Sequence, residues 1–414
     1  MFDLTRRELI AGMGGIALSS TVRGQQAPTG LEGAVTGSPH RADFAIPADI
    51  TFINSAYTHP LPIKSVEAVQ AHLARRSVPG VTMPDSGDLS TAVKGHFAAL
   101  INARPHEISF IPNTSMGENL VVHGLGIPGS GGNVVTDALH FDGAILHLQA
   151  LQQRGLDLRI AMPKDGRIDM ADLAKLVDRN TRLIEVSQVA MYNGFEHDLK
   201  EVSDLAHAHG AYVYADIIQG AGAVPLDVRA TGVDFCACAS FKWLMADFGL
   251  GFLYVREELL DRVITRTHFG YHSSPDIGTH FLPYDPPAAA PFTWEFGTSA
   301  AAHFEVGSNA LGALAALGAS LPYIRSLGVE NIQAWRKPLL ERLHAEMPRL
   351  GLRPVTPAGT TSPLISFVFD ENKRVGERLT ARKINARVGK NYLRLSPSVF
   401  NDMADIDRVL DALS

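Results

Sequence analysis

Residues 181–216, TRLIEVSQVAMYNGFEHDLKEVSDLAHAHGAYVYAD, decide the fold. The apolar run RLIEVSQV predicts a buried strand, and a helix is expected to begin near Leu199 and to stop at Gly210. The apolar face of this helix consists of Leu199, Val202, Leu205 and Ala206. The run AYVYAD then predicts a second strand that ends at Asp216. This order of elements is typical of a parallel sheet with covering helices.

The same alternation extends in both directions along the chain. Before residue 181, the strands EISFIPN and NVVTDAL precede helical stretches at 115–124 and about 143–154. After residue 216, VDFCACAS predicts a further strand, and GLGFLYV is expected to pair with the series in antiparallel orientation. The sequence therefore predicts an α/β fold.

The pattern changes beyond Thr298. Long helices rich in alanine and leucine are expected at 301–321 and 331–347, followed by LISFVF, a helix near 374–386 and NYLRLS. The segment PYDPPAAAPF (283–292) predicts a loop before them. We therefore expect a second, smaller α+β domain. The predicted division is 1–35 for a signal peptide and linker, 36–60 for an N-terminal arm, 61–295 for a large domain and 296–414 for a small one.

Composition limits the classes of protein to consider. The 414 residues are 46% hydrophobic and 19% charged, which fits a globular protein and excludes disorder as the main plan. The net charge of −6 and the lack of a basic block argue against nucleic acid as a partner. The two cysteines, Cys236 and Cys238, fall on one face of a predicted strand, so we expect free, buried thiols.

The N-terminus resembles a twin-arginine export signal. Arg6 and Arg7, in TRRELI, precede an apolar stretch from Leu9 to about Leu18 that is too short for a stable membrane span. The resemblance predicts export to the periplasm, with a mature protein that begins near residues 25–35. The alternative is an ordinary amphipathic first helix with a basic pair.

Three groups with complementary chemistry follow predicted strands. Asp216 ends one strand at the edge where open α/β sheets collect ligands, and Lys242 follows the next strand between two aromatic residues that should lower its pKa. Thr114 and Ser115 begin a helix, whose N-terminal N–H groups suit a phosphate. A Schiff-base lysine, a carboxylate and a phosphate site are what pyridoxal 5′-phosphate (PLP) requires. Because His197, His207 and His209 lack metal-ligand spacing, we expect them at the surface.

Over roughly residues 50–410 the sequence resembles the class V aminotransferase and cysteine desulfurase family of fold-type I PLP enzymes. The resemblance implies a mostly parallel seven-stranded sheet. DIIQGAG resembles the Asp-x-x-Gln motif, so Asp216 would pair with the pyridine nitrogen and Gln219 with the ring hydroxyl. SFKWLMADFGLGFLYV resembles the lysine motif, which implies Lys242 as the Schiff base and Ser240 as a phosphate contact. Phe241 stands where many members have histidine, and the resulting Phe-Lys-Trp sequence is closer to the Tyr-Lys-Trp form of kynureninase-like and isopenicillin N epimerase-like members.

Two further motifs imply cofactor contacts. LHFDG resembles the segment that supplies the ring-stacking side chain, which implies His140, with Phe141 as the alternative. WEFGTSA resembles the motif that reaches the phosphate of the neighbouring subunit's cofactor. Thr298 therefore implies a homodimer with shared active sites.

The predicted substrate contacts lie near the two ends of the stretch of sequence that resembles this family. NYLRLSPSVFND resembles the substrate-carboxylate motif, and the strand phase places Arg394 in the cleft if Leu393 and Leu395 enter the core. An arginine suits a carboxylate because it binds both oxygens at once. NSAYTHP resembles the substrate-side loop and implies Asn54 and Tyr57.

The resemblance leaves several reactions open. Lys242 is the natural base for the substrate Cα–H, so we expect aminotransferase-like or epimerase-like chemistry on an amino acid or an amino-acid-derived metabolite. A C–S lyase or kynureninase-like C–C lyase is the first alternative, and a non-catalytic binding protein is the second. Desulfurases of this family take sulfur on a mobile cysteine of the small domain. Because residues 239–414 contain no cysteine, a persulfide-forming desulfurase is disfavoured.

Overall fold

The computed structural model describes residues 40–80, 86–274 and 295–414. The predicted export signal and the proline-rich loop at 283–292 lie outside these ranges. None of the helices within the ranges combines the length and apolar character that a bilayer-spanning helix requires.

A seven-stranded sheet forms the main scaffold, which confirms the predicted α/β fold. The strand order is β2-β8-β7-β6-β5-β3-β4, where all pairs are parallel except those of β8 with β2 and β7. The antiparallel role predicted for GLGFLYV is therefore confirmed. The strands are β2 (Ile108–Ile111), β3 (Asn133–Asp137), β4 (Asp157–Ala161), β5 (Thr181–Ser187), β6 (Tyr212–Asp216), β7 (Phe235–Ala239) and β8 (Gly251–Val255).

The unit that decides the fold forms as predicted. Helix α6 (Leu199–Ala208) connects β5 to the parallel β6, and its N-cap Asp198 accepts hydrogen bonds from two first-turn N–H groups. Gly210 adopts φ +76°, the left-handed conformation that ends the helix. Leu199, Val202 and Ala206 are buried against the sheet because they recur at helical spacing.

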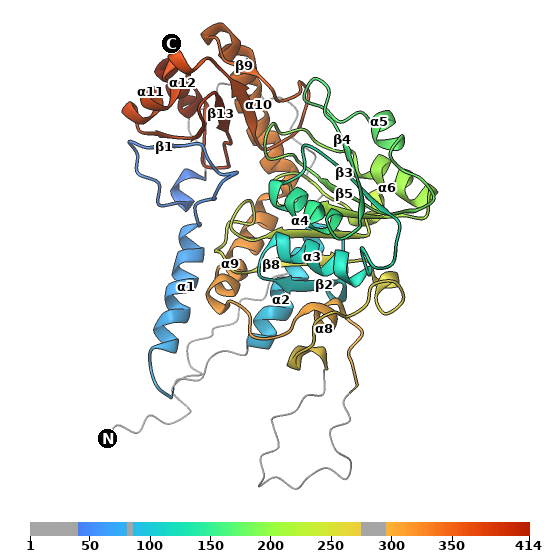
Figure 1. Cartoon of the computed structure of the whole chain (residues 1–414). Coiled ribbons are helices and arrows are strands. Elements are labelled where there is room, and N and C mark those ends of the chain that lie inside the picture. Colours follow the sequence, from blue (N-terminus) through green and yellow to red (C-terminus); the bar gives the residue numbers. More distant parts are fainter. Residues whose placement is uncertain (1–39, 81–85, 275–294) are drawn as a thin grey trace, which may run out of the picture. The chain divides into compact units, whose positions relative to one another are not determined.

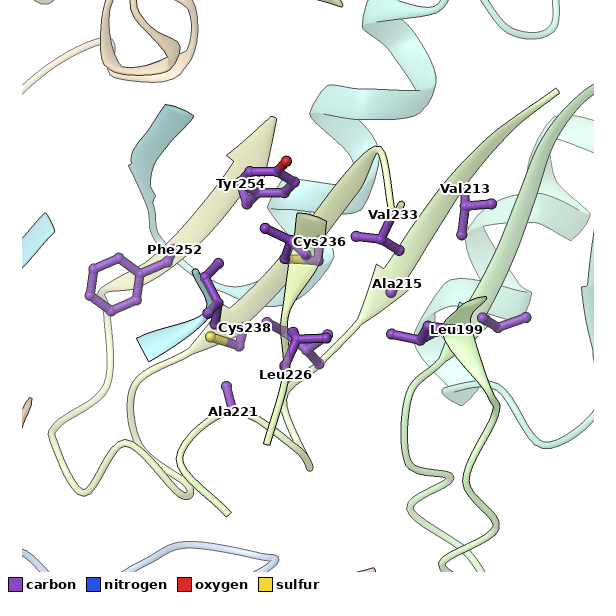
Figure 2. Close-up of a cluster of buried hydrophobic side chains, with 14 of the residues drawn as sticks. Leu199, Val213, Ala215, Ala221, Leu226, Val233, Cys236, Cys238, Phe252 and Tyr254 are labelled. Atoms are coloured by element: carbon purple, nitrogen blue, oxygen red, sulfur yellow. The ribbon is translucent and has the colours of Figure 1, made fainter. Parts of the chain in front are cut away.

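Helices cover both faces of the sheet. Helices α3 (Thr114–Gly124) and α4 (Asp142–Gln152) pack against each other and over one face (Figure 1). The other face packs against α6, α2 (Ser86–Leu100) and α9 (Leu311–Leu327). Figure 2 shows part of this second core, including the free, buried thiols of Cys236 and Cys238. Burial raises the pKa of both thiols, so they are inert packing residues, as expected.

A second sheet follows near the C-terminus. It has the order β12-β13-β10-β9 and packs against α10 (Val329–Glu346), α11 (Val375–Ala381) and α12 (Met403–Leu413). Its strands are β9 (Arg353–Pro354), β10 (Ile365–Val368), β12 (Arg387–Val388) and β13 (Tyr392–Leu395). β1 (Thr51–Phe52) pairs separately with β11 (Ile384–Asn385). The remaining helices are α1 (Ile63–Arg76), α5 (Met170–Ala174), α7 (Val228–Thr231) and α8 (Ala300–Phe304). The domain boundaries remain a prediction.

The structure corrects one predicted helix. The stretch 301–321 is not continuous, because α8 ends at Phe304 and α9 begins only at Leu311. The interruption contains Gly307, Ser308 and Asn309, which are poor helix formers. The Glu305 carboxylate in this break contacts Lys94 Nζ at 2.5 Å and accepts the Phe110 N–H at 2.9 Å. These contacts hold the segment between α8 and α9 against β2.

Candidate active site

Lys242 lies in a tight loop between β7 and β8. Main-chain hydrogen bonds close the loop, from the Ser240 N–H to Leu250 O (3.0 Å) and from the Ala246 N–H to Ser240 O (3.1 Å). The Met245 N–H donates to Lys242 O at 2.9 Å. The lysine therefore projects from a fixed backbone rather than from a free loop.

The Lys242 amine lies in an apolar environment, as predicted. Trp243 is 1% exposed, and the lysine Nζ lies 5.8 Å from the centre of the Phe241 ring. Burial lowers the pKa of Lys242 to about 8, while the charge of Asp216 acts in the opposite direction. Within the described ranges, Nζ has no hydrogen bond or ion pair. A large part of this amine is neutral near pH 8 and free to act as a nucleophile.

Asp216 ends β6 beside Ser187, its register partner on β5. One carboxylate oxygen accepts the Ile218 N–H at 2.9 Å. Burial raises the pKa of Asp216, and the proximity of His140 offsets part of this rise. Because Asp216 and Lys242 each shift the pKa of the other, the predicted acid and amine share one site.

His140 follows β3 and is fully buried. Its Nδ1 lies 2.8 Å from Ser187 Oγ, while Nε2 is buried without a partner among the residues described. A buried nitrogen without a partner is destabilising, so this atom is a place where a bound group could supply one. The alternative residue, Phe141, lies at the N-cap of α4.

The N-terminus of α3 lies against β7. The Asn113 side chain caps the helix by accepting the Met116 N–H at 2.9 Å. Thr114 Oγ1 accepts the Ala239 N–H at 3.0 Å, which leaves its hydroxyl proton to be donated elsewhere. The N–H groups of Thr114 and Ser115 have no acceptor within the helix, so this end of α3 suits an anion.

Arg394 of β13 reaches the same site from the second sheet. Leu393 and Leu395 are fully buried, which confirms the predicted strand phase. The Arg394 Nη1 donates to Met191 O at 2.9 Å, whereas its Nε is buried without a partner in the described chain. Burial lowers the pKa of Arg394, and its charge in turn helps to lower the pKa of Lys242.

The predicted substrate-side loop lies next to Gln219. Gln219 Nε2 donates to Ala56 O at 3.0 Å, and its Oε1 accepts the Trp243 Nε1–H at 2.9 Å. One of the two amide protons of Gln219 is therefore left for a bound group. Asn54 Oδ1 is buried without a partner among the described residues, whereas Tyr57 is 56% exposed.

Ser240 and Thr298, the other two predicted phosphate contacts, do not lie at the N-terminus of α3 with Thr114 and Ser115. Ser240 Oγ donates to Leu250 O at 2.7 Å and contacts Asp247 O, so its proton is used to close the lysine loop. Thr298 is exposed and lines a separate pocket of 540 Å³ with residues such as His106 and Asp261. Neither placement tests the predicted contact with a phosphate, which remains a prediction.

Sequence reasoning missed a buried pair at the base of the site. His197 was expected at the surface, but it is buried and its Nε2 lies 3.0 Å from Asp137 Oδ2. The other Asp137 oxygen accepts the Leu139 N–H at 2.8 Å. This pair fixes the turn that carries His140. The two partners lie 60 residues apart, so only the position of Asp137 at a strand end signals a role.

The model of the family described as aminotransferase class-V matches residues 84–409. The chain belongs to the class-V aminotransferase family. A probable cysteine desulfurase of Methanothermobacter thermautotrophicus is 28% identical over 313 residues, covering 74% of each chain. A cysteine desulfurase of Escherichia coli is 29% identical over 344 residues, covering 78% of this chain and 80% of that relative.

Solved structures share the fold. The apo cysteine desulfurase of Thermococcus onnurineus NA1 has a TM-score of 0.77 at 23% identity, covering 91% of this chain and 98% of that one. The cystine C–S lyase C-DES, in complex with its product cysteine persulfide, has a TM-score of 0.76 at 23% identity, covering 88% and 97%. A lysine-to-alanine variant of C-DES holds glycine covalently linked to its PLP cofactor.

PLP is the cofactor of this class-V aminotransferase family member. These groups fit the cofactor: among the residues that the structure describes, Lys242 offers an amine without a partner and the first turn of α3 offers main-chain N–H groups without an acceptor, while Asp216 offers a buried carboxylate. His140 Nε2 is a buried nitrogen that lacks a partner in the described ranges. When bound, PLP supplies an aldehyde for the lysine and an electron-accepting ring.

One buried acidic residue near the site, Glu185, has no partner for its carboxylate among the residues that the structure describes. Glu185 of β5 is the register partner of Tyr214 of β6, and this pair lies two residues before the Ser187–Asp216 pair on each strand. Glu185 is fully buried, and neither carboxylate oxygen has a partner within the described ranges. Burial, and then the charge of Glu118 on α3, raise the pKa of Glu185 well above its ordinary value. Glu118 itself lies 2.7 Å from His147 Nδ1 on α4. We therefore expect the Glu185 carboxyl group to keep its proton to a higher pH than an exposed glutamate does.

We predict that Glu185→Gln stabilises the protein increasingly as the pH rises. Above the ordinary glutamate pKa of about 4.3, the unfolded wild-type chain ionises while folded Glu185 stays protonated, so wild-type stability falls until the folded pKa is passed. The variant cannot ionise there, so the difference should grow by up to about 1.4 kcal/mol per pH unit. Unfolding by denaturant at several pH values between 5 and 9 measures it.

The matched control is Glu67→Gln, an exposed carboxylate without an ion pair in the part of the chain that the structure describes. Its stability difference from wild type should not depend on pH. A pH-independent difference for Glu185→Gln as well would show that Glu185 is ionised in the folded protein.

Proposed function

We propose that this protein is a PLP-dependent enzyme that acts at the α-carbon of an amino acid or an amino-acid-derived metabolite, with aminotransferase-like or epimerase-like chemistry. The observation that carries the proposal is the buried Lys242 amine, whose pKa is lowered to about 8 and which lies close enough to Asp216 and Arg394 for both charges to shift that pKa. A lysine, an acid and an arginine in one site match three needs: a base that also binds the cofactor, a partner for the ring nitrogen, and a binding group for an α-carboxylate.

In this proposal each side chain has a distinct task. Arg394 binds the substrate carboxylate, since its Nε is buried without a partner in the described chain. Lys242 takes the proton from the α-carbon, because a pKa near the working pH suits a general base. Asp216 keeps the ring nitrogen protonated, and His140 stacks on the ring.

The remaining predicted residues hold the rest of the ligands. Thr114 and Ser115 bind the phosphate, to which Ser240 is a further proposed contact, and Gln219 binds the ring hydroxyl. Asn54 and Tyr57 line the substrate side, where the Asn54 Oδ1 lacks a partner within the described ranges.

A C–S or C–C lyase is the second candidate, and the names of the relatives favour it. The curated relatives are cysteine desulfurases, and C-DES is a cystine C–S lyase. A persulfide-forming desulfurase is disfavoured here, because the chain has no cysteine beyond Cys238 and burial raises the pKa of both thiols. A lyase that needs no cysteine of its own remains compatible with these residues.

Thr298 supports a proposed homodimer with shared active sites. It is exposed and lies in a pocket that none of Lys242, Asp216 and Arg394 lines, so its predicted phosphate contact would be to a second subunit. The mass of the protein in solution tests this, and a monomer that retains PLP and activity would contradict it.

We also propose export by the twin-arginine route, supported by TRRELI at residues 5–10. This route carries folded proteins, so the enzyme would load its cofactor before it crosses the membrane. We predict that replacing both Arg6 and Arg7 by lysine moves the protein from the periplasmic to the cytoplasmic fraction. A wild-type protein found only in the cytoplasm would contradict the proposed export.

We predict that Lys242→Ala abolishes the visible absorbance band of the lysine-bound cofactor and reduces turnover by at least about 100-fold, the usual range for a lost acid–base group. Absorption spectra and initial rates measure both effects. The control is Lys200→Ala, an exposed lysine paired with Asp204, which should behave as wild type. An unchanged spectrum for Lys242→Ala would refute the assignment of the lysine.

The reaction class is tested with a panel of L- and D-amino acids added to the PLP-loaded protein. We expect either conversion of the bound cofactor to its aminated form, which is transamination, or entry of solvent deuterium at Cα with the visible band retained, which is epimerisation. Mass spectrometry and absorption follow these two outcomes. Release of sulfide, ammonia or a cleaved side chain would instead establish the lyase alternative.

A further inference from the structure

Two arginines stand directly opposite each other at the edge of the site. Arg387 of β12 is the register partner of Arg394 of β13 in an antiparallel pair. Residues directly opposite in such a pair project from the same face of the sheet, with Cα atoms about 4.5–5.5 Å apart. Arg387 therefore stands beside the arginine that the proposed function assigns to the substrate carboxylate.

This arrangement is unfavourable in the protein alone. Like charges directly opposite on neighbouring strands destabilise a sheet, and the charge of Arg387 helps to lower the pKa of Arg394. Within the described ranges, neither guanidinium has an ion pair with a carboxylate. Arg387 is exposed, so water screens part of this repulsion, and an anion bound between the two guanidinium groups would relieve the rest.

The Arg387 guanidinium is held at the substrate side of the site. It lies 5.5 Å from the centre of the Tyr57 ring, a cation–π contact that orients the side chain. Tyr57 follows Ala56, whose carbonyl accepts from Gln219 and whose N–H donates to Ser396 Oγ at 3.0 Å. The loop that carries Tyr57 is thus held by hydrogen bonds to Gln219 and to Ser396, the residue that follows β13.

We propose that Arg387 and Arg394 form a two-arginine subsite, and that the substrate carries a second acidic group. Arg394 binds the α-carboxylate, and Arg387 binds a carboxylate or similar anion on the side chain. An amino acid with a short acidic side chain presents two carboxylates a few bonds apart, which matches two guanidinium groups on adjacent strands. This inference rests on the proposed function, because it takes Arg394 as the α-carboxylate site.

The first test uses ligands that cannot react. Calorimetric titration of the PLP-loaded protein with succinate or glutarate should show binding at least about tenfold tighter than with propionate, as expected for one added charge-assisted pair. Arg387→Met should remove this preference and leave propionate binding unchanged. The control, Arg382→Met, alters an exposed arginine of the turn after α11 and should behave as wild type.

The second test uses amino acids and the cofactor spectrum. Aspartate or glutamate should perturb the wild-type spectrum at concentrations at least about tenfold lower than alanine, and Arg387→Met should lose this difference. Equal weakening for acidic and neutral amino acids would show that both arginines hold one carboxylate and would overturn the subsite. The same conclusion would follow if wild type responded equally to both classes.

A wild-type protein whose spectrum responds to no amino acid, but which still prefers dicarboxylates in calorimetry, would contradict the proposed function while supporting the two-arginine subsite. Binding of all these acids with equal affinity would contradict the subsite alone.

Discussion

The burial of the Lys242 amine is the constraint on which the site depends. An ammonium group in an apolar wall is unfavourable, so the pKa falls and the neutral amine becomes accessible at ordinary pH. The nearby Asp216 limits this fall, and Arg394 extends it. The state of the lysine is therefore set by two groups on different elements, and its position by a loop with internal hydrogen bonds. Changes in any of these elements would alter the nucleophile itself.

The two faces of the seven-stranded sheet have different chemistry. On β5–β7, the face shown in Figure 2 carries a cluster of buried apolar side chains and the two thiols, which pack against helices. The face covered by α3 and α4 carries Glu185, Tyr214 and Asp216 in a row that leads to the ligand edge. The raised pKa of Glu185 matters here, because an ionised carboxylate at this position, in addition to that of Glu118, would raise the pKa of Asp216 further and oppose its role as an anion. A Glu185 carboxyl group that keeps its proton therefore favours the ionised form of Asp216.

The sequence predicted the sheet, the strand ends and the main site because these depend on local patterns. Asp216 and Lys242 follow apolar runs, and the phase of Leu393 and Leu395 places Arg394, so period and position alone locate them. The buried His197–Asp137 pair and the buried carboxyl group of Glu185 could not be found in this way, because their surroundings come from distant segments. The helix predicted over 301–321 fails for two reasons: Gly307, Ser308 and Asn309 are poor helix formers, and Glu305 makes contacts to Lys94 and Phe110 that only the folded chain provides.

Residues 191 and 192, which follow β5, connect the two sheets through hydrogen bonds and help to position Arg394. Met191 O accepts the Arg394 Nη1–H, and Tyr192 O accepts the hydroxyls of both Ser366 and Tyr392. Three side chains of the second sheet thus bind two consecutive carbonyls that follow β5, the strand whose end carries Ser187 beside Asp216. A shift of this segment would move Arg394 relative to Lys242. In the proposed function, the distance between the substrate carboxylate and the reacting α-carbon would therefore depend on these hydrogen bonds from side chains to main-chain carbonyls as well as on the arginine, and small displacements there would weaken catalysis strongly.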